Sequence, residues 1–461
     1  MRSRRISRCG DSIELNSDVP ARGPHHWGGR RLRLAYYLLM GNISSGHHDY
    51  SLSDEASPGM NQPILPLEDI RVLDLTHFVN GPYATMLLGH MGAEIIKVES
   101  PKWGDGMRPG YRRSPEQPIG LAFALMNSNK RSITLNLKSD EGREIFKRLV
   151  VNADVVVENY EAGTMERMGL AYEVLRQVNP RIIYANSTGY GQSGPNRNLP
   201  AFDPIVQAMT GVMAVTGLPE DPPLKAGAIM ADVLGATHLC AGILGAIRQR
   251  DRTGEGLMVE ISMQEAVLPS MVSHISAYYG MGLRQLREGN RGSGGVITPA
   301  NAYPASDGWV VILAADNHRW RKLCAIMQRL DLGEDARYAK LSGRSRHRDE
   351  IDAIIGEWTS TRTRGELMEL LNANDIICGV VKELPEVMTD QHLLERGALQ
   401  EIDHPQLGPI TIFTSPLRFN GEPSRPHSPS PVLGADNQQV YCGDLGLSAD
   451  EVASLRQRKI I

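Results

Sequence analysis

The stretch IRVLDLTHFVNGPYATMLLGHMGAEIIKVES, residues 70–100, decides the fold class. Its first residues, 70–76, form an apolar run that is typical of a buried strand, and residues 81–92 carry small and apolar residues in a helical pattern. Residues 93–100 predict a second strand. A strand, a helix and a strand in this order predict a βαβ unit, in which both strands lie parallel in one sheet.

The same alternation continues along the chain. Further strands are predicted at residues 132–137, 154–160, 181–191 and 256–263, and helices at 139–153, 172–180, 203–217 and 232–250. The helix at 139–153 opens with Ser139, a residue that caps helices well. Strands that alternate with helices predict an α/β fold with a doubly wound, mainly parallel sheet.

The remaining sequence predicts a second, smaller α+β domain. Residues 264–282 predict a long helix that leaves the sheet, and the Gly-rich residues 286–308 predict a mobile loop or linker. A strand at 309–315 and charged helices up to residue 373 follow. We therefore expect an N-terminal extension at 1–62, a large domain at 63–265, a linker helix and Gly-rich loop at 266–295, a small domain at 296–400, and a return linker with a C-terminal helix packing on the large domain at 401–461.

Residues 1–59 show no hydrophobic period, and Met60 stands just before the strongly patterned region. The extension is therefore interpreted as a mis-assigned start with Met60 as the working start, a disordered tail, or an organelle-targeting segment. Its apolar run at 30–41 has a basic flank but lies far from the N-terminus for a secretory signal. We expect a cytoplasmic protein, or a mitochondrial one if residues 1–59 are a transit segment.

Composition argues against several classes of protein. The formal net charge is −4 and the isoelectric point is about 6.4, so a basic surface for nucleic acid is not expected. No apolar run approaches the roughly 18 residues that span a bilayer, so no membrane partner is expected either. The five cysteines are scattered and have no metal-binding spacing, which indicates a reducing compartment and no metal site.

Two common phosphate-binding motifs are missing. A dinucleotide-binding Rossmann fold needs a GxGxxG turn after its first strand, but THFVNGP at 76–82 holds only Gly81. Glu99 stands where the ribose-binding acid would stand, yet the glycines are lacking. The stretch GNRGSGG at 289–295 lacks the Lys-Ser/Thr ending of a P-loop. Neither NAD nor a P-loop nucleotide is therefore expected.

Six motifs occur in a defined order and spacing. They are LEDIRVLDLTHFVNGPYATMLLGHMGAEIIKVESPKWGD (67–105), NSNKRSITLNLK (127–138), ADVVVENYEAGTMERMGL (153–170), NPRIIYANSTGYGQSGP (179–195), AFDPIVQAMTGVMAVTG (201–217) and GAIMAD (227–232). Together they resemble the family III CoA-transferases of the formyl-CoA and crotonobetainyl-CoA transferase type. The resemblance covers residues 64–461.

This resemblance implies a Rossmann-like large domain, a smaller domain joined to it by two linkers, and an interlocked homodimer. It implies an acyl-CoA thioester and a carboxylic acid as substrates, no permanently bound cofactor, and Asp232 as the catalytic nucleophile. A Gly-rich lid loop is implied at Gly292, Gly294 and Gly295. The implied CoA contacts are Val79, Asn80, Leu135, Asn136, Lys138, Asn159, Tyr160, Arg167, Phe202 and Asp203.

The sequence departs from the formyl-CoA transferase pattern at two CoA-binding positions. Ser100 stands where that pattern has an arginine, and Pro200 stands where it has a lysine. Each change removes a positive charge that would meet the anionic CoA. We expect the nearby Lys102, Lys130 and Arg131 to compensate.

Asp232 lies in a run of small and apolar residues, AGAIMADVLGATHL at 226–239. Its position predicts the N-cap of the following helix, where a carboxylate accepts hydrogen bonds from free backbone N–H groups. The resemblance adds the role of nucleophile, and the two roles are compatible. A carboxylate that attacks a thioester forms a mixed anhydride, and the freed CoA thiolate converts it to an aspartyl-CoA thioester.

Two other functions compete with CoA transfer. An α-methylacyl-CoA racemase shares the fold, but it needs a histidine immediately before the acid of AFDPIV, and Phe202 stands there. A CoA-binding protein without activity is the second alternative. His77 is interpreted as a structural residue, because transfer needs no proton carrier. Arg287 or Arg291 is expected to meet the second carboxylate of a dicarboxylic acid.

Overall fold

The computed structural model describes residues 65–112, 114, 117, 119–284, 287–292, 297–424 and 426–461. The N-terminal extension expected at 1–62, with Met60, lies outside these residues. So do Gly294 and Gly295 of the expected lid loop.

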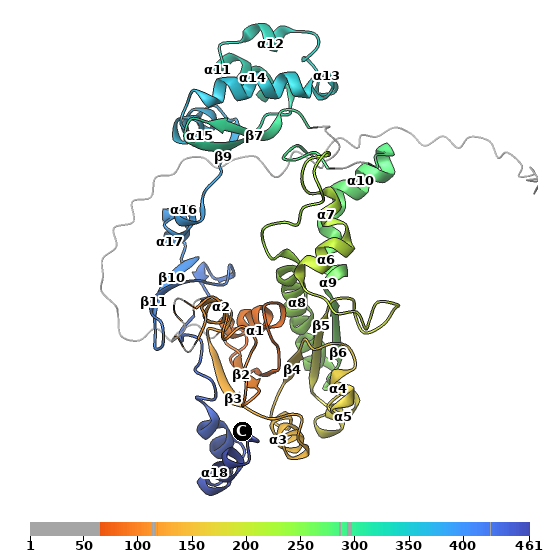
Figure 1. Ribbon diagram of the computed structural model, residues 1–461, viewed down its shortest axis with the longest axis vertical. Helices are drawn as coiled ribbons and strands as arrows, with labels where there is room; N and C mark the ends of the chain where they lie inside the picture. Colours follow the sequence, from red (N-terminus) through yellow and green to blue (C-terminus); the bar gives the residue numbers. More distant parts are fainter. Residues whose placement is uncertain are drawn as a thin grey trace, which may run out of the picture. The chain divides into compact units, whose positions relative to one another are not determined.

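Six parallel strands form the central sheet in the order β3-β2-β1-β4-β5-β6 (Figure 1). The strands are β1 (Arg71–Asp74), β2 (Glu94–Glu99), β3 (Lys130–Thr134), β4 (Val155–Glu158), β5 (Ile183–Thr188) and β6 (Met258–Ser262). The chain builds outward from β1 to β3 and then returns to β4 on the other side of β1. This order confirms the predicted doubly wound parallel sheet.

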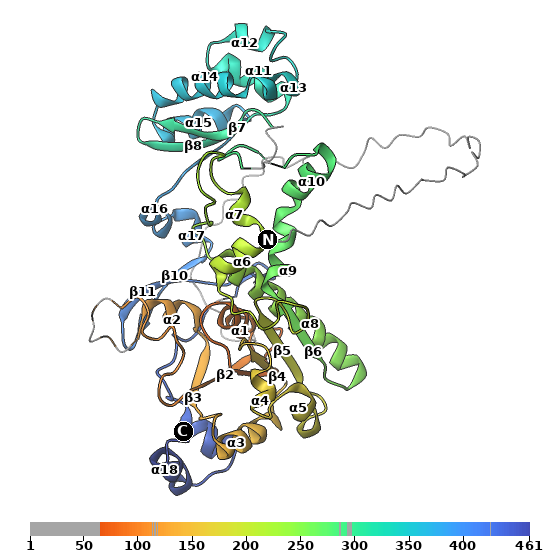
Figure 2. The same cartoon turned by 45° about the vertical axis from the view of Figure 1, so that its right-hand side comes forward.

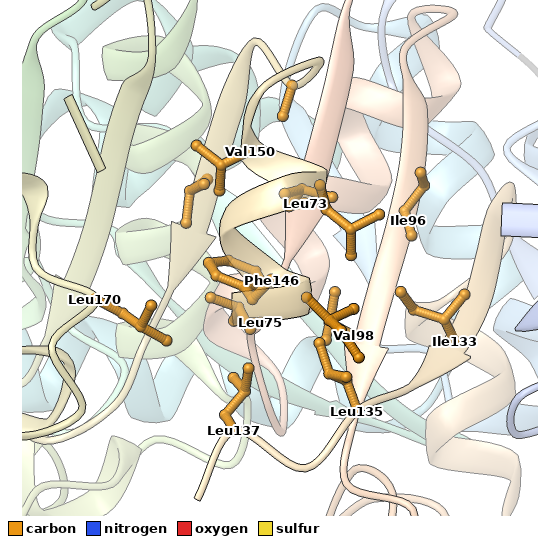
Figure 3. Packing of buried hydrophobic residues seen from close by; sticks show 14 of the residues in the cluster. Leu73, Leu75, Ile96, Val98, Ile133, Leu135, Leu137, Phe146, Val150 and Leu170 are labelled. Atoms are coloured by element: carbon orange, nitrogen blue, oxygen red, sulfur yellow. The ribbon is translucent and has the colours of Figure 1, made fainter. Parts of the chain in front are cut away.

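The two faces of the sheet bury alternate residues of each strand, as a parallel sheet covered on both sides requires. On one face, Phe146 of α3 lies among Leu73, Leu75 and Val98 (Figure 3). On the other face, Val72 and its neighbours pack against α1 and α8. Helices therefore cover both faces of the sheet, and the strand ends are where a binding site in such a sheet lies.

The helices around the sheet largely follow the predicted pattern. They are α1 (Asn80–His90), α2 (Leu121–Met126), α3 (Asp140–Val150), α4 (Thr164–Arg167), α5 (Tyr172–Val178), α6 (Asp203–Thr210), α7 (Val212–Val215), α8 (Met230–Thr253), α9 (Met263–Val267) and α10 (Val272–Met281). Ser139 caps α3 as predicted, because its side chain accepts a hydrogen bond from the Gly142 N–H.

Two predicted helices are interrupted. The helix expected at 203–217 is divided into α6 and α7 at Gly211, whose φ of +89° is left-handed and cannot continue a right-handed helix. The long helix expected after β6 contains a 3-10 turn, η1 (Leu268–Met271), which includes Pro269. Proline lacks the N–H that would continue the α-helical hydrogen bonds.

A second core lies around a small antiparallel sheet of β7 (Ala300–Ala305), β8 (Gly308–Leu313) and β9 (Ile377–Val380). Figure 2 shows β7 and β8 beside α14 and α15. Strand β7 lies in the stretch predicted as a loop, so that prediction is wrong for residues 300–305. They pair with β8 along their full length and bury Tyr303. The helices here are α11 (Asn317–Ile326), α12 (Leu330–Glu334), α13 (Leu341–Arg346), α14 (Arg348–Ser360) and α15 (Arg364–Ala373).

The chain then returns to the large sheet. The elements after β9 are α16 (Leu384–Met388), α17 (Gln391–Glu395), β10 (Leu399–His404), β11 (Gly408–Phe413), β12 (Arg418–Phe419), β13 (Glu422–Pro423), the π-helical turn η3 (Gln439–Asp444) and α18 (Ala449–Gln457). Residues of η3 and α18, with Ile460 and Ile461, pack in the same core as Phe146. The domain boundaries themselves stay a prediction.

Helix α8 has the length and composition of a membrane-spanning segment, although no such segment is expected from the sequence. In this chain α8 packs against α1 and strands β5 and β6, and buries Leu239 and Ile243 in the core. A core helix of a globular protein passes the same test of length and composition.

Candidate active site

A cavity of about 390 Å³ lies at the carboxyl ends of β1, β4 and β5. In an open parallel sheet this is where ligands bind, because the strand order reverses between β1 and β4 and leaves a crevice. The residues that line it are His77, Phe78, Asn80, Asn159, Tyr160, Glu161, Ala162, Thr164, Ser187, Thr188, Gly189, Arg197, Leu199, Pro200, Ala201, Phe202, Asp232 and Met263.

Asp232 is the third residue of α8, and the prediction that it caps this helix is wrong. The cap position is Ile229, and the carboxylate that binds the helix end comes from Asp203. The Ala231 N–H donates to Asp203 Oδ1 at 2.6 Å. Because Asp203 takes the capping role, the Asp232 carboxylate makes no side-chain hydrogen bond or ion pair with any residue that the structure describes.

The surroundings of Asp232 favour a reactive carboxylate. Burial raises its pKa to about 6, and the negative charge of Asp203 adds to the increase. The group is therefore mostly ionised at neutral pH although it is poorly hydrated. The first turn of α8 offers its positive dipole end to this charge. A poorly hydrated carboxylate that no side chain binds is available for nucleophilic attack.

Gln207 fixes the chain just before α8. This residue of α6 is fully buried, and its Nε2 donates to Asp203 Oδ2 at 2.6 Å. Its Oε1 accepts a hydrogen bond from the Ala226 N–H at 2.9 Å. Asp203 and Gln207 thus join α6 to the start of α8 and set the position of Asp232.

Asn80 holds the other side of the same helix turn. Its Nδ2 donates to the backbone carbonyl of Asp232 at 2.9 Å. The contact is close enough that a Cβ atom on Gly235 would lie 2.3 Å from Asn80 Nδ2. Gly235 therefore allows the loop after β1 to reach the backbone beside the carboxylate.

The loop after β1 is held by its neighbours. His77 N–H donates to Asn159 Oδ1, and Asn159 Nδ2 donates back to the His77 carbonyl, both at 2.8 Å. Phe78 has a φ of +64°, an uncommon conformation for a residue with a side chain, and its N–H donates to Asp105 Oδ1 at 3.2 Å. Several hydrogen bonds thus stabilise this conformation beside the cavity.

Beneath this loop lies a buried charge cluster of three acids and three bases: Asp74, Lys97, Glu99, Asp105, Arg108 and Lys130. Lys97 Nζ lies 2.9 Å from Asp105 Oδ2 and donates to the Thr76 carbonyl at 2.7 Å. Although burial raises the pKa of Asp74, the charges of Lys130 and Lys97 lower it below its usual range. The balanced charges anchor the loop that carries Asn80.

His77 lines the cavity, with Nε2 3.4 Å from the Tyr160 hydroxyl oxygen. Burial lowers its pKa below the ordinary value, so the imidazole is neutral at pH 7. The paired backbone contacts of His77 with Asn159 fit the structural role expected for this residue.

The structure brings together part of the predicted site. Asn80, Asn159, Tyr160, Phe202 and Asp232 all line the cavity. The predicted residues that do not line it are Val79, Leu135, Asn136, Lys138, Arg167, Asp203 and Gly292. Their roles in binding CoA stay predictions.

Three of the residues outside the lining have defined environments. Leu135 is buried in the core, and Lys138 is exposed at the start of the segment that leads to α3. Arg167 is exposed, and its Nη2 donates to Thr164 Oγ1 at 2.8 Å. Because Thr164 lines the cavity, Arg167 lies directly behind its wall.

The expected compensation by basic residues is partly wrong. Lys130 is buried in an ion pair with Asp74 at 2.9 Å, and Arg131 pairs with Glu94, so neither is free for a phosphate. Lys102 remains exposed beside the ring of Trp103. Buried ion pairs have no sequence pattern that separates them from free charges, which explains the error.

Four further lining residues are not predicted by the sequence patterns: Arg197, Glu161, Ser187 and Thr188. The last two end β5, and parallel strands place their carboxyl ends at one edge, so the predicted topology was a usable signal. Arg197 lies in an irregular loop and gives no such signal. In the described part of the chain, no group of three His, Cys, Asp or Glu side chains could hold a metal ion.

Comparisons with known proteins give the family of this chain. A family model described as CoA-transferase family III matches residues 67–437. The chain is 36% identical over 401 residues to the succinyl-CoA–D-citramalate CoA-transferase of Chloroflexus aurantiacus, covering 87% of this chain and 99% of that protein. It is also 36% identical over 412 residues to the formyl-CoA:oxalate CoA-transferase of Streptomyces coelicolor, covering 86% and 99%.

Among solved structures, a CAIB/BAIF family protein from Brucella suis matches with a TM-score of 0.73 and 30% sequence identity, covering 83% of this chain and 99% of that one. The cavity at the strand-order reversal lies where ligands bind in Rossmann-like sheets. The chain belongs to CoA-transferase family III. Enzymes of this family use CoA thioesters as substrates.

Proposed function

We propose that this enzyme transfers CoA from an acyl-CoA thioester to a free carboxylic acid, with Asp232 as the covalent nucleophile. The observation that carries the proposal is Asp232, which lines the cavity and whose carboxylate has no side-chain partner in the described chain. The relatives named above are succinyl-CoA and formyl-CoA transferases, so succinyl-CoA and formyl-CoA are the first donors to test.

The proposed reaction needs no net proton transfer. The Asp232 carboxylate attacks the thioester carbonyl and expels the CoA thiolate, which leaves an aspartyl-acyl anhydride. The thiolate then attacks the aspartyl carbonyl and releases the first acid, which leaves an aspartyl-CoA thioester. The second acid attacks this thioester to form a new anhydride and free the thiolate. Attack of the thiolate on the new acyl carbonyl restores Asp232 and releases the product thioester.

The proposal is tested with the full chain, succinyl-CoA or formyl-CoA, and a panel of carboxylic acids. We expect new acyl-CoA products by mass spectrometry, and an Asp232 hydroxamate when hydroxylamine traps the intermediate. A thioester substrate that exchanges its α-proton with deuterated solvent while no CoA moves would overturn the proposal. That outcome would favour the racemase.

The pH dependence of the reaction tests the role of Asp203. In Asp203→Asn the amide oxygen can still accept from the Ala231 N–H and cap α8, while the hydrogen bond from Gln207 Nε2 and the negative charge that helps to raise the Asp232 pKa are lost. Because Asp232 must be ionised, activity falls as the pH drops through about 6 in the wild type. We expect this acid limb at lower pH in the variant, with kcat at pH 8 changed by less than about tenfold.

A second group, Glu158, titrates in the same pH range, because burial raises its pKa to about 7. It is present in both the wild type and Asp203→Asn. Its titration contributes equally to both pH profiles and cannot produce the difference. An unchanged acid limb in Asp203→Asn would contradict the electrostatic role of Asp203.

We further propose the interlocked homodimer that the family resemblance implies. It is supported by several exposed apolar side chains on α10, including Val272, Tyr278 and Tyr279. Exposed apolar patches of this kind mark interfaces between proteins. Light scattering on the purified chain should give the mass of two chains, and a monomer mass would refute the proposal.

A further inference from the structure

Arg197 is the single permanent cation in the described lining of the active-site cavity. The lining also holds two acids, Glu161 and Asp232, while His77 is neutral at pH 7 because burial lowers its pKa. The formal charge of the cavity wall is therefore negative before any substrate binds. An incoming carboxylic acid adds charge of the same sign, and a dicarboxylic acid adds it twice.

The guanidinium group of Arg197 is available for a substrate. The residue is exposed, and among the described residues its side chain forms no ion pair or hydrogen bond. Its backbone is placed by a turn in which the Arg197 N–H donates to the Gly194 carbonyl at 3.4 Å. By contrast, two basic side chains beneath the loop after β1 are held in ion pairs, Lys97 with Asp105 and Lys130 with Asp74.

The two arginines expected to meet a second carboxylate are placed elsewhere. Arg291 is paired with Asp349 and Asp352, at 2.7 and 2.8 Å. Arg287 lines a different cavity, together with Glu220, Asp221 and Glu288. Neither residue lines the cavity that contains Asp232. Arg197 is therefore the cation in its described lining that can pair with a second carboxylate.

We propose that Arg197 binds the second carboxylate of a dicarboxylic acid substrate while the first carboxylate reacts at Asp232. The inference rests on the proposed transfer reaction and names its substrate class. A guanidinium group matches a carboxylate in geometry and in charge, because its parallel N–H donors reach both oxygens. The same pairing offsets the repulsion between the dianion and the acids of the wall.

The test compares two acceptors of similar length, succinate and butyrate, with one acyl-CoA donor. In Arg197→Ala we expect the KM for succinate to rise about 10- to 100-fold, as expected for a lost charge-assisted hydrogen bond, with kcat changed far less. The KM for butyrate should change by less than about twofold, because butyrate has no second carboxylate. Arg197→Lys should retain part of the preference for succinate.

Arg248→Ala is the matched control, because Arg248 is an exposed arginine near the other end of α8 and does not line the cavity. It should leave both KM values unchanged. Equal changes for succinate and butyrate in Arg197→Ala would overturn the inference. So would a raised KM for the CoA donor that disappears with a 3′-dephospho-CoA donor, since Arg197 would then bind the phosphate. Wild-type enzyme that transfers CoA to neither acid nor any other would refute the proposed function itself.

Discussion

Asp232→Ala is expected to abolish CoA transfer, with a loss of at least about 10³-fold in kcat, because no other group can form the covalent intermediate. The fold should remain intact. The side chain makes no hydrogen bond or ion pair with the described residues, and its burial raises its pKa, so its removal costs the folded state little. Mass spectrometry should find the wild-type chain, and not the variant, carrying CoA after incubation with the donor.

Asp232→Asn separates the loss of the nucleophile from the loss of cavity volume. The amide has almost the shape of the carboxylate but attacks thioesters poorly, so it should be as inactive as Asp232→Ala. Both variants should still bind the acyl-CoA thioester, which equilibrium dialysis measures. Transfer at the wild-type rate by either variant would remove Asp232 from the mechanism.

Lys130→Met is expected to destabilise the fold by about 3–5 kcal/mol, the typical cost of removing one partner of a buried ion pair. Lys130 Nζ lies 2.9 Å from Asp74 Oδ2 and also donates to Thr85 Oγ1 and Asn127 Oδ1. The variant leaves the Asp74 charge facing fewer donors in a site without water contact. Urea unfolding of wild type and variant measures the difference.

The double variant Asp74→Asn/Lys130→Met tests the cause. It removes both charges, so it should be more stable than Lys130→Met alone although it lacks one more carboxylate. Lys102→Met, at an exposed position, is the control and should change stability by less than about 0.5 kcal/mol. If the double variant were less stable than Lys130→Met, an unpaired charge would not be the cause.

The parallel sheet could be predicted because its strands are short apolar runs separated by helices, a local pattern. Strand β7 could not, since ANAYPA is made of small and polar residues and becomes a strand only by pairing with β8. Gly211 and Pro269 are helix breakers that stand in the sequence, but the apolar pattern on both sides of each predicts a continuous helix. Tertiary pairing and single backbone breakers limit what such patterns show.

Some residues of the candidate site could be predicted from the sequence, and others could not. The acid at 232 stands out by its apolar surroundings, and the motifs around Asn80, Asn159 and Phe202 reach the same cavity. The cap of α8 was assigned to the wrong aspartate, because a carboxylate 28 residues away along the chain supplies it. Whether a basic side chain is free or paired also depends on residues that are distant in the sequence, as Lys130 and Arg197 show.

The return of the chain to the large sheet constrains the order of folding. Tyr441, Val452 and Ile460 complete a core that begins with Leu73, and the Asn136 N–H donates to the Ile460 carbonyl at 2.7 Å. The sheet that forms the active site therefore keeps one face partly uncovered until the ribosome has released residues 440–461. The core around β7, β8 and β9 is built from residues 303–378 and can form earlier. During synthesis, the face of the large sheet opposite α8 is therefore the last to be covered.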